Sequence, residues 1–209
     1  MIWVILVPFQ LLIAVFCYLT NWFVTFFADE KGDLPGFLAL WQTWDDSLDV
    51  DWFVEKTVPS CFRYDFAKHY ENIQYSTPEL TAVGRDRYGV RVIDPNFTTK
   101  EKIQRYFCRT LWLYRNCAFG FTFWWFGRQV DNNNLVYIHK DYKEPDVDRT
   151  FAYDKTQSIL TRTWTYKNNN HLFGNVYWSI YLGWKIPFWD NSTSVHRAMI
   201  ANRIWFGTK

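Results

Sequence analysis

The stretch PFQLLIAVFCYLTNWFVTFFA, residues 8–28, decides how this chain is organised. It ends a run, residues 1–28, that carries no charged side chain. A helix of about 20 residues crosses a hydrocarbon core of about 30 Å. We therefore predict a transmembrane anchor over residues 1–28, ended by Asp29 and Glu30. The polar breaks in the run are Gln10, Thr20, Asn21 and Thr25.

Two other interpretations of the run are a cleaved signal peptide and a buried core helix. A signal peptide has a basic start and a small-residue cleavage site, and this run has neither. A core helix of this length without a charge would be unusual. Positive residues favour the cytoplasmic side of a membrane. Because Lys31 is the only cation close to the anchor, we expect a single-pass protein with its domain in the cytoplasm.

The cysteines agree with a reducing compartment. Their spacing contains no CxxC pair, and an odd thiol remains if two of the three outside the anchor are joined. The four are Cys17, Cys61, Cys108 and Cys117.

The amino-acid composition indicates a surface at which an apolar environment meets water. The chain has 209 residues, a net charge of +2, 22% aromatic residues and 13 Trp. A near-neutral charge gives no field that attracts nucleic acid, so we expect no nucleic-acid partner. Trp and Tyr are enriched at membrane interfaces and binding faces. An aromatic core accounts for part of this excess.

After the anchor, we expect an acidic juxtamembrane linker over residues 29–60 and an aromatic-rich α+β domain over residues 61–209. Thr98 or Thr99 can cap a helix that begins near Lys100. Apolar residues recur along it at helical spacing. They are Ile103, Phe107, Leu111 and Tyr114.

The C-terminal part reads as an antiparallel β-meander with one buried face. Its clearest period-two signal runs along residues 175–186. This alternation predicts that one set of side chains is buried. The set is Val176, Trp178, Ile180, Leu182, Trp184 and Ile186.

Residues 111–127, LWLYRNCAFGFTFWWFG, are the most aromatic segment. A second membrane crossing is disfavoured because Arg115 would lie near mid-bilayer. The segment either contacts the membrane interface or forms the hydrophobic core of the domain. For the first alternative, basic and aromatic side chains would contact lipid headgroups. We predict these to be Arg105, Arg109, Arg115, Trp124 and Trp125.

A cluster of carboxylates is the candidate metal site. Closely spaced carboxylates can gather hard cations such as Ca²⁺ or Mg²⁺. A solvated acidic loop is the alternative. No sequence motif of a common enzyme class is present and no cofactor is expected. The candidate ligands are Asp45, Asp46, Asp49 and Asp51.

Three patches resemble a family of small uncharacterised proteins encoded by tailed bacteriophages. The first joins FADEKGDLP, residues 27–35, to WQTWDDSLD, residues 41–49. The others are LWLYRNCAFGF, residues 111–121, and LGWK, residues 182–185. The resemblance implies a phage source and no catalytic residues.

These observations predict a membrane-anchored phage protein of the host inner membrane, non-enzymatic, acting through the lipid bilayer or a host or phage membrane protein. One alternative is a metal-assisted enzyme on a lipid or cell-envelope substrate. The other is a virion or assembly component.

Overall fold

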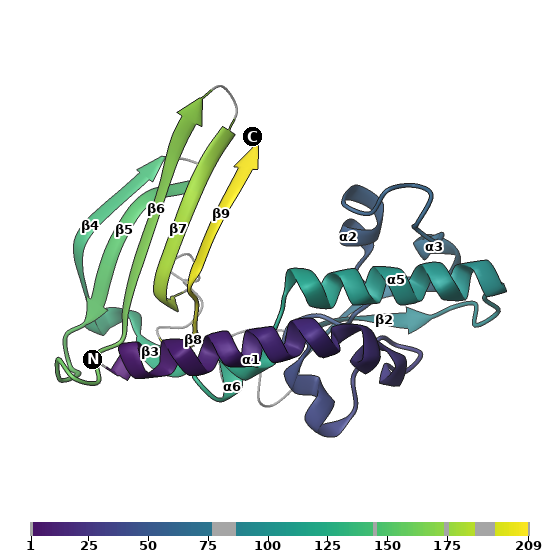
Figure 1. Ribbon diagram of the computed structural model, residues 1–209, viewed down its shortest axis with the longest axis horizontal. Coiled ribbons are helices and arrows are strands. Elements are labelled where there is room, and N and C mark those ends of the chain that lie inside the picture. Colours follow the sequence, from purple (N-terminus) through teal and green to yellow (C-terminus); the bar gives the residue numbers. More distant parts are fainter. Residues whose placement is uncertain (1, 77–86, 144–145, 174–175, 187–194, 209) are drawn as a thin grey trace. The chain divides into compact units, whose positions relative to one another are not determined.

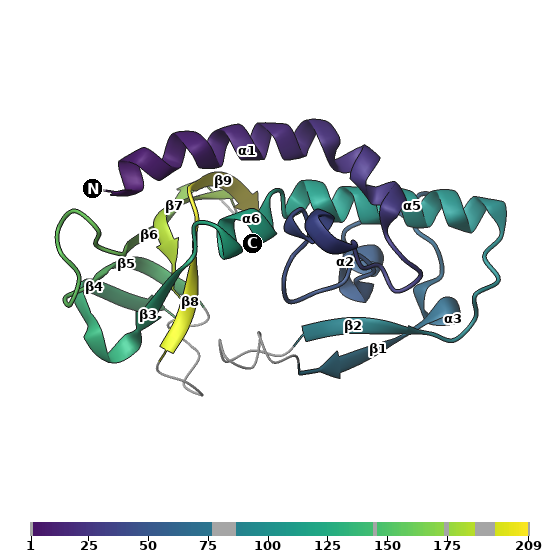
Figure 2. The ribbon, with the colours of Figure 1, turned by 90° about the horizontal axis from the view of Figure 1, so that it is seen from below.

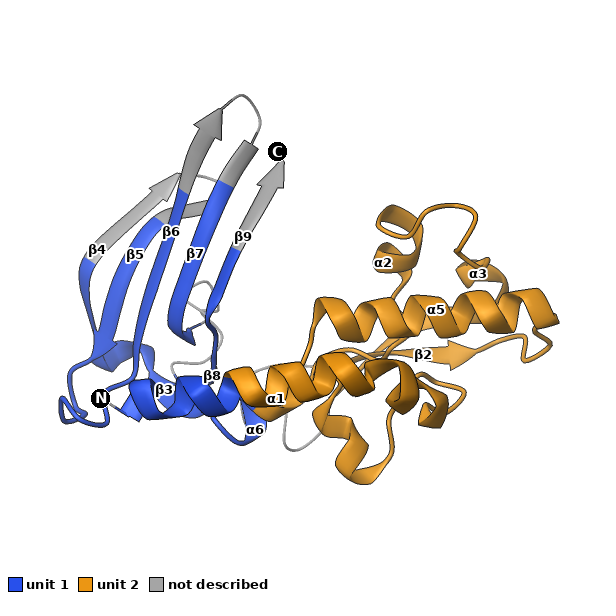
Figure 3. Ribbon diagram, viewed as in Figure 1, with its two compact units in different colours: residues 1–10, 122–209 blue, residues 11–121 orange. Residues whose placement is uncertain are grey.

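The computed structural model describes residues 2–76, 87–143, 146–173, 176–186 and 195–208. It confirms the predicted α+β class, with a long apolar N-terminal helix, a second long helix and an antiparallel sheet (Figure 1). The chain forms two compact units (Figure 3). Unit 1 contains residues 1–10 and 122–209, and unit 2 contains residues 11–121. Helix α1 (Ile2–Val24) supplies residues to both.

Unit 2 is mainly helical. The apolar turn η1 (Thr25–Phe27) continues α1. Helix α5 (Thr99–Arg115) begins at a capping box, in which Thr98 accepts from the backbone N–H of Glu101 and the Glu101 carboxylate accepts from that of Thr98. The remaining elements are η2 (Gly36–Leu40), α2 (Asp51–Lys56), α3 (Phe66–His69) and the antiparallel pair β1 (Tyr70–Tyr75) and β2 (Arg87–Val92).

The acidic segment 29–60 is packed into unit 2. It supplies Leu34, Trp41, Leu48 and Phe53 to the buried core. The same core receives Cys17 and Val24 from α1, and Cys108, Trp112 and Leu113 from α5. Burial of this apolar surface holds the two long helices to the segment that joins them.

Unit 1 is built on a seven-stranded sheet. Strands β4 to β7 follow one another as an antiparallel meander, β8 lies between β3 and the end of β7, and β9 pairs with β7. The strands are β3 (Arg128–Asp131), β4 (Leu135–Lys143), β5 (Asp146–Asp154), β6 (Trp164–Phe173), β7 (Val176–Lys185), β8 (Val195–Ile200) and β9 (Arg203–Thr208). The short elements α6 (Phe119–Trp124) and η3 (Asn132–Asn134) precede β3 and β4.

The predicted alternation along β7 is wrong in its middle. Ser179 and Tyr181 are buried, whereas Trp178, Ile180 and Leu182 are half-buried. Trp184 and Ile186 are fully buried, as predicted. The side chain of Val176 lies outside the described residues.

Gly183 explains the change of face. Its φ of +93° is a conformation that side-chain-bearing residues rarely adopt. This single residue breaks the period of two, although β7 keeps its register with β6 there, with Thr165 opposite Gly183. Buried positions therefore fall on odd numbers before it and on even numbers after it.

Candidate functional site

The outward half of α1 is the most unusual surface of the protein. Every exposed residue of Ile2–Phe27 is apolar or aromatic. Leu19 is 69% exposed, Trp22 53% and Phe23 51%. We define the outward half by its large exposed side chains. They are Val4, Ile5, Phe9, Leu11, Leu12, Val15, Phe16, Tyr18, Leu19, Trp22, Phe23, Phe26 and Phe27.

The other half of α1 faces protein, and the polar breaks of the sequence lie there. In unit 1, Gln10 Oε1 accepts from Asn202 Nδ2 at 2.5 Å. The Asn202 Oδ1 atom accepts from the indole of Trp3 at 3.0 Å and from the backbone N–H of Gly183 at 3.3 Å. One amide therefore ties the first turns of α1 to the end of β7.

Unit 2 holds the rest of α1 by similar contacts. Thr20 Oγ1 accepts from the Trp41 indole at 2.9 Å, and Thr25 Oγ1 accepts from Thr110 Oγ1 at 3.1 Å. Asn21 is fully buried, with its amide 3.9 Å from the Cys117 sulfur. All four polar breaks thus bond to protein. The helix turns its polar side chains toward the protein and exposes only apolar ones, whereas an ordinary surface helix exposes its polar side.

Helix α5 extends the apolar surface. It lies beside the C-terminal half of α1 in two perpendicular views (Figures 1 and 2). The rings of Tyr106 and Phe26 stack at 4.5 Å, and those of Tyr114 and Tyr18 at 5.8 Å. The stripe predicted from helical spacing is exposed at three positions next to these tyrosines. These are Ile103, Phe107 and Leu111.

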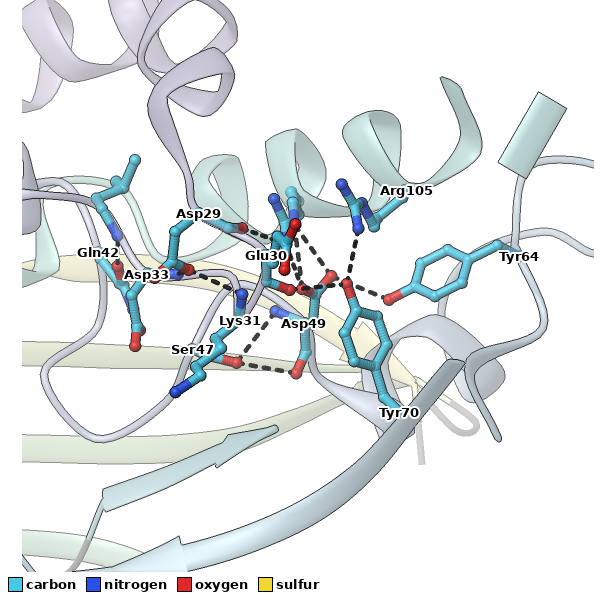
Figure 4. Close-up of polar contacts among 12 residues, drawn as sticks. Asp29, Glu30, Lys31, Asp33, Gln42, Ser47, Asp49, Tyr64, Tyr70 and Arg105 are labelled. Atoms are coloured by element: carbon cyan, nitrogen blue, oxygen red, sulfur yellow. Dashed lines mark hydrogen bonds and ion pairs between the residues drawn. The ribbon is translucent and has the colours of Figure 1, made fainter. Parts of the chain in front are cut away.

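A buried polar network fixes α5 to the loop that follows α1 (Figure 4). The carboxylate of Asp49 accepts from Arg109 Nη2 at 2.5 Å and from the Tyr64 hydroxyl at 3.0 Å. Arg109 also donates to the Asp29 carbonyl at 2.9 Å. Burial, and then the charge of Asp49, raise the pKa of Tyr64 well above its usual value, so this phenol remains a donor.

Arg105 completes the network at its edge. It donates to the Tyr70 hydroxyl at 2.9 Å, and that hydroxyl donates to the Glu30 carbonyl at 3.1 Å (Figure 4). Burial raises the pKa of Tyr70 to about 12. Arg105, Arg109 and Asp49 each have hydrogen-bond partners in this network, as buried polar groups require.

A family model matches residues 1–208 of the chain. The chain belongs to DUF7338, a family of unknown function. No curated protein and no solved structure matches the DUF7338 chain significantly.

The predicted membrane-interface residues lie in different surroundings within their units. Arg109 is buried in its ion pair, and Arg105 lies over the Phe97 ring at 4.2 Å. Arg115 is exposed but lies 4.7 Å from the Trp52 ring centre. Trp124 and Trp125 are exposed in unit 1. Sequence reasoning missed the burial of Arg109 because its partner is distant in the chain.

The aromatic segment 111–127 contains both buried and exposed rings. Phe119, Phe121 and Phe123 are buried, so they belong to the cores of the units. The indoles of Trp124 and Trp125 face outward. The chain turns sharply at Ala118, between the end of α5 and these rings, and the φ of Ala118 is +59°.

The four predicted metal ligands have different partners. Asp49 is engaged by Arg109, and Asp51 accepts from Asn72 at 2.7 Å. Burial, and then the neighbouring Asp45, raise the pKa of Asp46 to about 7. Within the described residues, His, Cys, Asp and Glu side chains form no group of three that could hold a metal ion.

Proposed function

We propose that this chain is a phage-encoded protein of the host inner membrane. It is held there by α1 and acts through contacts with lipid or with a membrane protein, without catalysing a reaction. The observation that carries the proposal is the reversed polarity of α1. Its outward half is apolar from Val4 to Phe27, and its polar side chains bond to protein.

Lipid is the medium that such a helix requires. Contiguous exposed apolar patches beyond a few hundred Å² mark interaction sites or membrane contacts. Each large apolar side chain that leaves water contributes roughly 1.5 to 3 kcal/mol. The contacts of Cys17, Asn21 and Val24 with unit 2 give this helix a place in the folded protein, which favours a retained helix over a cleaved signal peptide.

The protein-facing stripe also bears on the orientation of α1. Residues of α1 contact unit 1 near Trp3 and Gln10 and unit 2 from Ile13 onward. If α1 crossed the bilayer, α5, which packs on its C-terminal half and carries Arg105, Arg109 and Arg115, would enter hydrocarbon, at a high cost in free energy. We therefore propose that α1 lies along the bilayer surface with its outward half among the acyl chains.

Flotation of the full chain with phosphatidylcholine vesicles tests the proposal. The wild-type protein should float with the vesicles. Replacing Leu12, Leu19 and Phe23 together by Gln should weaken partitioning about a hundredfold or more, since three buried side chains are lost. A matched control replaces three exposed apolar residues elsewhere by Gln.

The control residues are Ile93, Val195 and Ile204. This control should float like the wild type. A wild-type chain that stays with the soluble fraction, or two triple variants with equal partitioning, would refute the proposal.

A further inference from the structure

Unit 1 contains a pocket of about 480 Å³ beside the first turns of α1. This volume lies in the range of small-molecule sites, which are mostly apolar with a few placed polar groups. The Trp3 and Trp164 rings meet edge to face at 5.1 Å in its wall. The apolar lining comes from Trp3, Val4, Ile138, Phe151, Ile159 and Trp164.

Arg162 is the charged group of this pocket. Its guanidinium lies 4.5 Å from the centre of the Tyr153 ring, which also lines the pocket. Its two hydrogen bonds to the Gln157 carbonyl are long, both at 3.4 Å. Among the described residues, no carboxylate forms an ion pair with Arg162. The side chain therefore has donors to offer an anion.

The rim of the pocket is apolar and exposed. Val4 is 57% exposed, Ile138 62% and Ile159 72%. Val4 also belongs to the outward half of α1, so the pocket opens next to the surface proposed to contact lipid. An amphiphile could enter from the bilayer without exposing its chain to water.

We infer that this pocket binds a single-chain amphiphile with an anionic headgroup, such as a fatty acid or a lysophospholipid. The chain lies against the indoles and aliphatic side chains, and the headgroup pairs with Arg162. One part of this inference rests on the proposed function, namely that the ligand comes from the bilayer. Apolar lining together with one available guanidinium selects this class over an uncharged lipid.

Photo-crosslinking of the full chain in amphipol tests the inference. The probes are diazirine-bearing palmitate, lysophosphatidylglycerol and the uncharged monopalmitoylglycerol, with attachment sites mapped by mass spectrometry. The anionic probes should label pocket residues, and Arg162→Gln should reduce this labelling about tenfold. Arg149→Gln, an exposed arginine of β5, is the matched control and should have little effect.

Ile138→Trp, which fills the pocket, should reduce labelling by every probe. Equal labelling by charged and uncharged probes, equal effects of the two arginine variants, or attachment confined to the outward half of α1 would overturn the inference. Since amphipol contains no bilayer, these outcomes are separate from failure of vesicle flotation, which would contradict the proposed function.

Discussion

The guanidinium of Arg109 on α5 forms a buried ion pair with the carboxylate of Asp49, with 2.5 Å between Nη2 and Oδ2. Sixty positions separate the two residues in the chain. The pair joins the long helix to the segment just before α2, and Arg109 also donates to the Asp29 carbonyl in the loop that leaves α1. It therefore positions the exposed stripe of α5 beside the outward half of α1.

Breaking this pair should destabilise the protein strongly. Arg109→Met should lower the free energy of unfolding by about 3 to 5 kcal/mol, because it leaves a buried carboxylate without its partner. Arg115→Met on the same helix should cost less than about 1 kcal/mol, since Arg115 is exposed. Urea denaturation in mild detergent measures both. Similar costs for the two variants would show that the ion pair contributes no more to the stability of unit 2 than an exposed arginine does.

A double variant separates the pair from its surroundings. Asp49→Leu combined with Arg109→Met removes both charges, so it should be more stable than either single variant. Additive losses would show that the two residues do not act together.

Asp46 should make stability fall as pH rises. Its pKa is about 7 in the folded protein against 3.8 in an ordinary aspartate. Between these values the folded state holds a proton that the unfolded state has lost, so this group's contribution is full below about pH 4 and is lost toward pH 7.

The variant Asp46→Asn should remove that loss. It should be more stabilising, relative to wild type, at pH 8 than at pH 4.5, as judged by urea midpoints. Glu55→Gln, at an exposed position of the nearby α2, is the control and should show no such trend. A pH-independent difference for Asp46→Asn would contradict the prediction.

Gly183→Ala should be costly for two reasons. Its φ of +93° strains any side chain, and an added Cβ would lie 2.3 Å from the Trp164 carbonyl oxygen. Gly36 also has positive φ, at +52°, but a Cβ there meets nothing within 4 Å. Thermal unfolding should therefore show a larger loss for Gly183→Ala than for Gly36→Ala. Equal losses would indicate that crowding at Gly183 is unimportant.

Local patterns predicted the elements of this fold well. The uncharged run predicts α1, Thr98 is the cap of α5, and the C-terminal alternation predicts a meander. These features depend on neighbours within a few residues. The α+β class follows from them.

The features that the sequence does not predict depend on contacts between residues far apart in the chain and on backbone angles. In the sequence, Arg109 belongs to a basic patch and Asp49 to an acidic cluster, but in the fold the two form an ion pair. The face change in β7 depends on the backbone angle of Gly183, which the alternation of its neighbours conceals. The apolar stripe of α5 was visible in the sequence, but periodicity does not say whether a stripe faces protein or lipid.

Cys61 can report the compartment of the protein. It is exposed, whereas Cys108 is buried. If the domain is cytoplasmic, a membrane-impermeant maleimide should label Cys61 only after the inner membrane is permeabilised. A Cys61→Ser variant is the control for the other thiols. Labelling of Cys61 in cells with an intact inner membrane would place the domain outside the cytoplasm.

The depth of α1 in the bilayer distinguishes a helix lying along the surface from a helix that crosses it. Single spin labels at Leu12, Val15, Leu19 and Phe26, with Cys61 and Cys117 replaced by Ser, report contact with oxygen and with a water-soluble nickel complex. An outward half lying along the surface predicts oxygen-rich labels at one shallow depth, roughly 5 to 10 Å below the headgroups. Depth that rises toward mid-bilayer and falls again would show a crossing helix, and labels reached mainly by the nickel complex would show that α1 does not enter lipid.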